Sequence, residues 1–369
     1  MPNFVNQNRF FSDFINEYMH ARGHDQDTNP PANFCDVDYY GREIMKSCNH
    51  GSQMANIDKY MGNKAGQYIA LLKYTQARGI PMPPYVPQTI PFHSKNVSKL
   101  RNRFGSGKRW ILKPVNGSFR IGVVVLDCYR DLLEEIHSKP RFKMWILQRY
   151  IERPLLMRGR KFHVRIYALL VRRRSEFSVY VYRHGVMYFA KMPYVSGTIS
   201  PDTHLSGGTT PEDMRFFPED FNRHFPGRVN HVLPQMYRIV HDTCDAIIDT
   251  LKCSNQSQKC FKLVAYDILV DDSFRCYLAE TNVRLIEFRY PPPEFKRTLY
   301  TNILDLYFDN RVNKKYWESI IDRAIASQPR TILEAFSEDT AQPTMDMGMT
   351  ALGVTCLLLA VGVLAHSRM

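Results

Sequence analysis

Closely spaced cysteine pairs are missing from this 369-residue sequence: its eight cysteines are scattered, and no C-x-x-C motif occurs. The disulfide framework of a small secreted protein and a structural zinc site of paired ligands are therefore both excluded. We expect the cysteines to be free thiols in a reducing compartment, where they serve as small core residues. The first residues contain no apolar run of signal-peptide length, so nothing predicts export.

Internal repeats, low-complexity segments and the G-K-[ST] ending of a P-loop are also absent. The composition is that of an ordinary globular protein, with 44% hydrophobic, 12% aromatic and 23% charged residues, which excludes disordered and fibrous classes. The 49 lysines and arginines outnumber 36 aspartates and glutamates, so the formal net charge is +13. This excess favours acidic partners without choosing among nucleic acid, an anionic membrane, nucleotides and an acidic polypeptide.

One long apolar run stands near the C-terminus. Residues 347–365 carry no charge, and at ~1.5 Å per residue they would make a helix of roughly 28 Å, about the thickness of a bilayer's hydrocarbon core. A core helix should have a polar face, whereas this segment is apolar nearly all round. We expect a transmembrane tail anchor, joined by a polar tether at 331–346, with the catalytic domain on the cytoplasmic face of an intracellular membrane. A buried core helix or an amphipathic tail is the alternative.

Hydrophobic periodicity divides the rest of the chain into a weakly patterned N-terminal lobe and lead-in, residues 1–109, and a strand-rich region, residues 110–330. In the second region, short apolar runs separated by turns predict a mixed α+β fold with antiparallel sheets flanked by helices. An extended connector is expected at 81–91, which contains five prolines. Helices are expected at 10–22, 64–78, 130–137, 233–251, 293–308 and 315–326, and late strands at 262–270 and 274–280.

An acidic hairpin is the first candidate site. Asp267 lies within one strand, and Glu280 and Asn282 end the strand that returns after a tight turn at 271–273. Because residues i and i+2 of a strand point to the same face, such a hairpin can bring the three side chains together. Two carboxylates and an amide oxygen suit a hard cation such as Mg²⁺. Solvated charges at a strand edge are the alternative.

Basic residues form the second candidate site. Lys113 ends a strand before a glycine-containing turn whose backbone amides could face a phosphate, although an ordinary hairpin has the same pattern. Lys161, His163 and Arg165 alternate with apolar residues and therefore share one sheet face. Arg183 would extend this basic surface on a neighbouring strand. If this basic surface faces the acidic hairpin across a cleft, the two together would provide a place for a triphosphate, a metal and an anionic substrate. The alternative is that the basic residues form a solvated face.

A resemblance to a known family is carried by six segments between about residues 110 and 282: WILKP, LQRYIERPLL, GRKFHVRIYALLV, VYVYRHG, HLSGG, and AYDILVDD followed by YLAETN. In this order the segments resemble the tubulin tyrosine ligase-like family, whose catalytic domain is of the ATP-grasp type. The resemblance implies that the nucleotide is bound by Lys113, Gln148, Arg149, Tyr150, Ile151, Lys161 and His163, with 148–151 at the adenine. It also implies that Arg165 and Arg183 hold the amino-acid carboxylate or an acyl phosphate, and that magnesium is bound by Asp267, Glu280 and Asn282.

The activity that the resemblance implies is ATP-dependent ligation of an amino acid to a protein carboxylate through an acyl phosphate. The implied cofactors are ATP and Mg²⁺, and the implied acceptor is an acidic tail such as that of tubulin, which suits the +13 charge. The alternative is a catalytically weakened, membrane-tethered protein of the same fold that binds nucleotide or tubulin. A nucleic-acid-binding protein is disfavoured, because no stacking motif or helix-turn-helix is present.

Several positions depart from the family pattern. The usual K-F-D-I-R has His163 at its acidic position, and the usual H-L-T-N ends here in Ser206 and Gly207. The glycine-rich turn has Ile121 beside Gly122, and the Asn-x-Ser-Pro run expected after Asn282 is missing. Loss of one buried polar partner typically costs about 1–3 kcal/mol. These departures predict slower catalysis with ATP binding retained.

Overall fold

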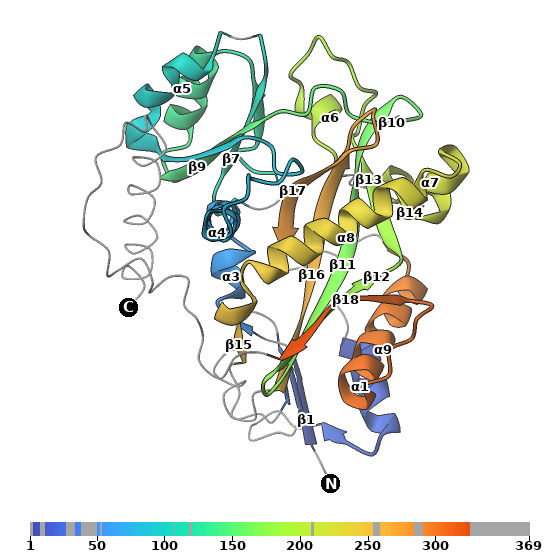
Figure 1. Ribbon diagram of the computed structural model, residues 1–369. Coiled ribbons are helices and arrows are strands. Elements are labelled where there is room, and N and C mark those ends of the chain that lie inside the picture. The colour runs from blue at the N-terminus through green and yellow to red at the C-terminus, as the bar shows by residue number, and fades with distance from the viewer. Residues whose placement is uncertain are drawn as a thin grey trace, which may run out of the picture.

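Two β-sheets of different size form the framework of the protein (Figure 1). The computed structural model describes residues 3–7, 12–26, 34–37, 50–51, 54–105, 107–117, 120–207, 210–253, 259–283 and 291–324. All statements about the structure below concern these residues.

The large sheet is built around one long strand, β11 (Arg160–Arg173), which pairs antiparallel with β16 (Lys259–Val270) along ten residue pairs. The first half of β11 also pairs with β13 (Gly185–Phe189), which continues to β14 (Met214–Phe217), and the second half pairs with β12 (Glu176–Tyr182), which continues to β18 (Trp317–Ala324). β17 (Cys276–Asn282) pairs with β16, and β10 (Leu156–Met157) with the start of β11. Four short strands extend the sheet in parallel pairings: β1 (Asn3–Gln7), β2 (Asp25–Gln26), β3 (Phe34–Val37) and β4 (His50–Gly51).

The small sheet has the antiparallel order β6 (Thr89–His93), β9 (Met144–Arg149), β7 (Trp110–Pro114) and β8 (Val124–Leu126). Helix α5 (Tyr129–Ser138) and the 3-10 helix η2 (Ser94–Arg103) pack against one of its faces. Trp110 and Trp145 are fully buried between sheet and helices. We call residues 89–150 the small lobe; because β6 belongs to it, this lobe begins before residue 109.

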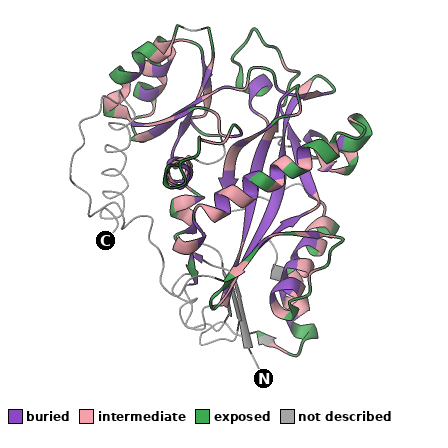
Figure 2. Ribbon diagram, viewed as in Figure 1, coloured by how far each residue is buried: buried purple, intermediate pink, exposed green. Residues whose placement is uncertain are grey.

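Helices cover both faces of the large sheet, and the side chains of β11 alternate between the two cores. Val164, Ile166 and Ala168 face the core under α8 (Val229–Asp245) and α7 (Glu219–His224). Tyr167 and Leu169 face the opposite core, under α1 (Ser12–Ala21) and α9 (Pro293–Asp309). Figure 2 shows the sheet strands buried and the outer sides of the helices exposed. The remaining elements are short: β5 (Met54–Ala55), α3 (Ile57–Tyr60), α6 (Pro201–His204), η3 (Pro211–Asp213), η4 (Ile248–Thr250) and β15 (Lys252–Cys253).

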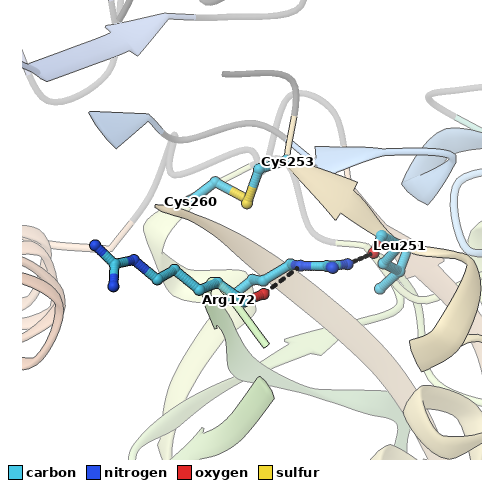
Figure 3. Close-up of a disulfide and its surroundings, with 5 residues drawn as sticks. Arg172, Leu251, Cys253 and Cys260 are labelled. Atoms are coloured by element: carbon cyan, nitrogen blue, oxygen red, sulfur yellow. Dashed lines mark hydrogen bonds between the residues drawn. A yellow bond between two sulfur atoms is a disulfide. The ribbon is translucent and has the colours of Figure 1, made fainter. Parts of the chain in front are cut away.

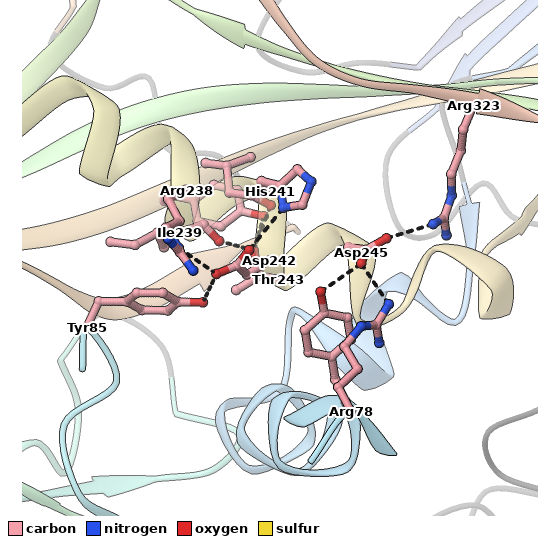
Figure 4. Close-up of polar contacts among 12 residues, drawn as sticks. Arg78, Tyr85, Arg238, Ile239, His241, Asp242, Thr243, Asp245 and Arg323 are labelled. Carbon is pink, nitrogen blue, oxygen red and sulfur yellow. Dashed lines mark hydrogen bonds and ion pairs between the residues drawn. The ribbon is translucent and has the colours of Figure 1, made fainter. Parts of the chain in front are cut away.

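Two aspartates of α8 tie the lead-in to the large sheet (Figure 4). Asp242 accepts a hydrogen bond from the Tyr85 hydroxyl at 3.1 Å. Asp245 binds Arg78, at the end of α4 (Lys64–Ala77), at 3.1 Å and Arg323 of β18 at 2.8 Å. This network fixes α4, and with it the N-terminal end of that helix, relative to the site described below.

The mixed α+β fold with antiparallel sheets is confirmed, as are the helices expected at 10–22, 64–78, 130–137 and 293–308. The helix expected at 315–326 is wrong, because Trp317–Ala324 forms β18. Its apolar residues recur with helical spacing, but antiparallel pairing with β12 decides the conformation. The expected 233–251 helix starts earlier and ends at Asp245, before a 3-10 turn.

The transmembrane part of the expected fold class needs correction. Among the described residues, none of the helices combines the length and apolarity needed to cross a bilayer. The segment expected to do so, 347–365, and its tether at 331–346 lie outside the described residues. The described residues therefore form an α+β fold, and the expected fold class is corrected to that.

The expectation of free thiols is wrong for two cysteines, since Cys253 and Cys260 form a disulfide (Figure 3). The bond joins the end of β15 to the start of β16, seven residues apart. Beside it, Arg172 of β11 donates a hydrogen bond to the carbonyl of Leu251. A spacing of seven residues matches no short cysteine motif, so the sequence alone does not indicate this pairing. Cys128, Cys244 and Cys276 are free.

Candidate functional site

The polar face of β11 lies at the junction of the two sheets. Lys161, His163 and Arg165 share one face, as the alternation predicts, and are flanked by apolar residues of the opposite face. Arg165 and Asp267 are direct cross-strand partners in the β11–β16 pairing. The guanidinium donates from Nε and Nη2 to the two carboxylate oxygens of Asp267, both at 2.7 Å.

Asp267 is the anionic centre of this face. Burial opposes its charge, but Arg165 and then His163 outweigh burial and hold the pKa of Asp267 at about 2. The Asn282 amide donates a third hydrogen bond to the carboxylate, at 3.1 Å. Glu280 is the cross-strand partner of Asp267 on β17. The hairpin therefore brings Asp267, Glu280 and Asn282 together, as the sequence predicts.

His163 stands beside this ion pair and is neutral at physiological pH, because burial lowers its pKa further than Asp267 raises it. Its Nδ1 is 2.8 Å from the Ser206 hydroxyl. Its Nε2 is 3.6 Å from the nearer Asp267 oxygen, too far for a hydrogen bond, and is buried without a hydrogen-bonding partner among the described residues. The Nε2 atom of His163 is therefore an unsatisfied polar atom beside Asp267.

Lys113 enters the site from the small sheet. Its ammonium donates to the Gln148 side-chain oxygen at 3.0 Å and to the carbonyl of Ala279, next to Glu280, at 3.1 Å. The Gln148 amide is fixed in turn by Thr89 at 2.9 Å. Burial, partly offset by Glu280, lowers the pKa of Lys113 to about 8.

Lys161 is the second buried lysine, with 3% of its surface exposed. Its ammonium donates to the Tyr150 hydroxyl at 2.9 Å, and this hydroxyl lies 2.7 Å from Nδ1 of His204. Burial, followed by repulsion from Lys113, lowers the pKa of Lys161 to about 7. In the described part of the chain, the hydrogen-bonding partners of Lys113 and Lys161 are all neutral oxygens.

Lys64 completes the site and was not singled out from the sequence. It is the first residue of α4. Its ammonium lies 3.3 Å from the Glu280 carboxylate and donates at 3.0 Å to the carbonyl of Gly117, in the turn after β7. The preceding Asn63 caps α4 by accepting a hydrogen bond from the amide of Gly66. An Asn before a helical pattern is a sequence signal for the start of a helix, but nothing in the sequence indicates the contact of Lys64 with Glu280.

The donor set suits magnesium in type, because Glu280 and Asn282 carry hard oxygen donors beside two lysines. Glu280 is one-third exposed, and Lys64 is its ion-pair partner among the described residues. Asp267 differs, since its three hydrogen bonds within the described part of the chain come from Arg165 and Asn282. Among the described residues, no group of three or more His, Cys, Asp or Glu side chains has an arrangement that could hold a metal ion. Any cation held here would therefore depend mainly on Glu280.

Three residues expected at the site lie elsewhere or contribute no polar group. Arg183 follows β12 on the α8 side of the sheet, where it pairs with Glu318 of β18 and acts electrostatically on Tyr237 of α8. Arg149 stacks over the Trp110 ring at 4.0 Å. Ile151 is half-buried just beyond β9. The structure thus separates Arg183 from Arg165.

Comparisons with known proteins match the region that supplies this site, apart from Lys64. The sequence model of the tubulin-tyrosine ligase family matches residues 85–284. Tubulin glycylase 3C of Tetrahymena thermophila is 25% identical over 48% of this chain and 18% of its own length. The human tubulin monoglycylase TTLL3 is 26% identical over 48% of this chain and 26% of its own, and the probable alpha-tubulin polyglutamylase Ttll1 of Tetrahymena is 30% identical over 47% of each. The matched region spans between about a fifth and a half of these relatives.

Proposed function

The chain belongs to the tubulin-tyrosine ligase family, and on this premise we propose that it binds ATP between its two sheets and ligates an amino acid to an acidic protein acceptor. One observation carries the proposal: two buried lysines from different sheets face the same site, and neither has an acidic hydrogen-bonding partner among the described residues. A buried ammonium among neutral oxygens is unfavourable unless an anion is bound. A nucleotide triphosphate supplies several negative charges at one place.

The roles of the residues follow from their positions. Lys113 and Lys161 would neutralise phosphate oxygens, and the turn held by Lys64 through Gly117 would place backbone amides beside them. The adenine would lie along 148–151, where Thr89 holds the side chain of Gln148 and His204 that of Tyr150. Glu280 and Asn282 would hold Mg²⁺, which supplies charge neutralisation to the phosphates when bound.

In the proposed reaction, ligation takes place in two steps. A carboxylate oxygen of the acceptor attacks the γ-phosphorus, and ADP leaves, which gives an acyl phosphate. The amine of the amino acid attacks the acyl carbon, phosphate leaves, and an amide forms with release of one proton. Positioning and charge neutralisation by the lysines and Arg165 are the protein's contribution.

An acidic tubulin-type tail is the acceptor that we propose. The names of the relatives describe tubulin glycylases and a tubulin polyglutamylase, and a net charge of +13 suits an acidic acceptor. Since ATP and such acceptors meet in the cytosol, we propose that the two sheets function there.

Nucleotide binding by the full-length chain tests this proposal. Lys113→Gln and Lys161→Gln should each weaken ATP binding about tenfold or more, because a charge-assisted contact to phosphate is lost. Lys73→Gln, a half-buried lysine of α4 outside the site, is the matched control and should bind as wild type does. Incubation with ATP, Mg²⁺ and each labelled amino acid on polymerised tubulin identifies the reaction. Wild-type protein that binds no ATP would refute the proposal.

A second function, nucleotide or tubulin binding without ligation, is favoured by two features. His163 stands where the family pattern has an acid, and Asp267 is held by Arg165 at both oxygens. ATP binding without any transfer of amino acid in the same assay would select this alternative.

A further inference from the structure

The small lobe carries most of the net positive charge of the chain. Residues 89–150 contain thirteen lysines and arginines but only four acidic residues, a net charge of +9 out of +13. All four acidic residues lie between 127 and 135, at the start of α5 and within it. The other segments of the lobe, 89–126 and 136–150, contain no carboxylate side chain.

Four exposed basic residues lie on two neighbouring segments of this lobe, which is at the upper left of Figure 1. Lys95, Lys99 and Arg101 are exposed on η2, and Lys143 is exposed just before β9. The two segments are adjacent, because the amide of Ser94 donates to the carbonyl of Lys143 at 2.8 Å. We call Lys95, Lys99, Arg101 and Lys143 the basic face.

The basic face lacks internal compensation among the described residues. The acidic residues of α5 nearest in sequence, Glu134 and Glu135, pair with Arg130 and Lys139 instead. Lys95 and Lys143 act on the same imidazole: burial lowers the pKa of His93, and repulsion from these two ammonium groups lowers it further. Like charges gathered without counter-ions repel one another, and an anionic partner relieves that repulsion.

We propose that the basic face docks an acidic, glutamate-rich polypeptide segment outside the site between the sheets. The choice of occupant rests on the proposed function, since the acceptor of that reaction is acidic. Nucleic acid is disfavoured because Trp110 and Trp145, which could stack on bases, are fully buried. A membrane is disfavoured because the basic face has no exposed large apolar side chain to insert.

Charge reversal in the full-length protein tests the docking surface. The test variant combines Lys95→Glu, Lys99→Glu and Arg101→Glu. The control variant combines Lys252→Glu, Lys314→Glu and Lys315→Glu, which are exposed lysines outside the small lobe and give the same change of charge. The probe is a fluorescent poly-glutamate peptide. We expect the test variant to bind it at least about tenfold more weakly and the control less than about twofold more weakly, with the difference shrinking as salt rises.

Two outcomes would overturn the proposal. One is equal loss of peptide binding in test and control variants, or no loss in either. The other is tighter binding of single-stranded RNA or phosphatidylserine vesicles than of the peptide, lost in the test variant, which would make the occupant wrong. ATP binding is measured in parallel and should be unchanged in both variants. Wild-type protein that binds the peptide through the basic face but binds no ATP would refute the proposed function while supporting the docking surface.

Discussion

Arg165 binds both carboxylate oxygens of Asp267, with its Nε and Nη2 each 2.7 Å from one oxygen. The two side chains are largely buried, with 13% and 6% of their surfaces exposed. A bidentate pair of this kind is geometrically specific and strong. Asp267 can bind another cation only if its hydrogen bonds with Arg165 break and Arg165 pairs with another anion. A ligand that uses Asp267 should therefore first rearrange this ion pair.

Removal of one partner of this pair should destabilise the protein strongly. Arg165→Met leaves a buried carboxylate uncompensated and should lower the free energy of unfolding by about 3–5 kcal/mol. Adding Asp267→Asn should recover part of this loss, because the stranded charge is removed. Urea denaturation of the two single variants and the double variant measures the coupling. A loss below about 1 kcal/mol for Arg165→Met would show that the pair does not matter for stability.

The same pair gives a pH dependence of known sign. The folded-state pKa of Asp267 is lowered to about 2, below the value in an unfolded chain, so its contribution to stability is complete above about pH 4. This contribution should disappear as the pH falls from about 4 to about 2. The stability difference between wild type and Asp267→Asn, followed over that range, should shrink accordingly; a constant difference would contradict it.

Proton uptake should accompany nucleotide binding. The pKa of Lys161 is about 7 and that of Lys113 about 8, so both are mostly deprotonated at pH 8.5, and bound phosphate favours their charged forms. ATP should therefore bind more tightly at about pH 6.5 than at about pH 8.5. Calorimetry in buffers of different ionisation enthalpy measures the protons taken up. Lys161→Gln should take up fewer protons than wild type, and equal uptake would exclude Lys161 as the group.

Glu280→Gln should remove the magnesium dependence of nucleotide binding without unfolding the protein. The substitution takes a charge from the proposed cation site with little change of volume, and the ion pair that it breaks, with Lys64, is partly exposed. The loss of stability should therefore stay within about 1 kcal/mol. ATP affinity with and without Mg²⁺ is the measurement. Glu294→Gln on α9 is the control, and a magnesium effect that survives in Glu280→Gln would remove the hairpin from the site.

His163→Asp should raise ligase turnover if the missing acid limits catalysis. A carboxylate at this position would stand close to Asp267, where two negative charges are compatible only with a bound cation. The variant should therefore bind Mg²⁺ more tightly, while His163→Asn, which adds no charge, should not. If the wild type already turns over at about 1 s⁻¹, within the usual enzyme range, His163 is an adequate substitute and the increase should not appear.

The disulfide should contribute measurably to stability. Cys253 and Cys260 are seven residues apart, and closing so short a loop is worth about 2 kcal/mol in the chain-entropy model. Cys253→Ser should lower the unfolding free energy by about this amount, and reducing agent should lower that of the wild type equally. Cys128→Ala, a change at a free thiol, is the control. If reducing agent left the unfolding free energy of the wild type unchanged, the disulfide would not contribute to stability.

The elements that follow strong local patterns could be predicted from the sequence. The alternation of Lys161, His163 and Arg165 gave the correct face of β11, and the hairpin around Asp271 brought Glu280 to Asp267. In both cases the two-residue period of a strand determines the geometry.

Contacts between distant segments could not be predicted. Lys64 reaches Glu280 only because α8 holds α4 in place, and no local pattern encodes that packing. Arg183 follows a strand with the right alternation, yet its strand is paired so that it turns to Glu318. The apolar residues of β18 have helical spacing, but antiparallel pairing with β12 makes this segment a strand. Each difference arises from tertiary pairing that outweighs local preference.

The shared strand β11 makes assembly of the site an all-or-none matter. A slip of one residue in its register against β16 would exchange the faces of the strand: Lys161, His163 and Arg165 would point into the apolar core under α8. Three polar side chains cannot be accommodated there. No partly shifted form can keep some of these groups in place, so loss of the correct register would abolish the whole polar face at once.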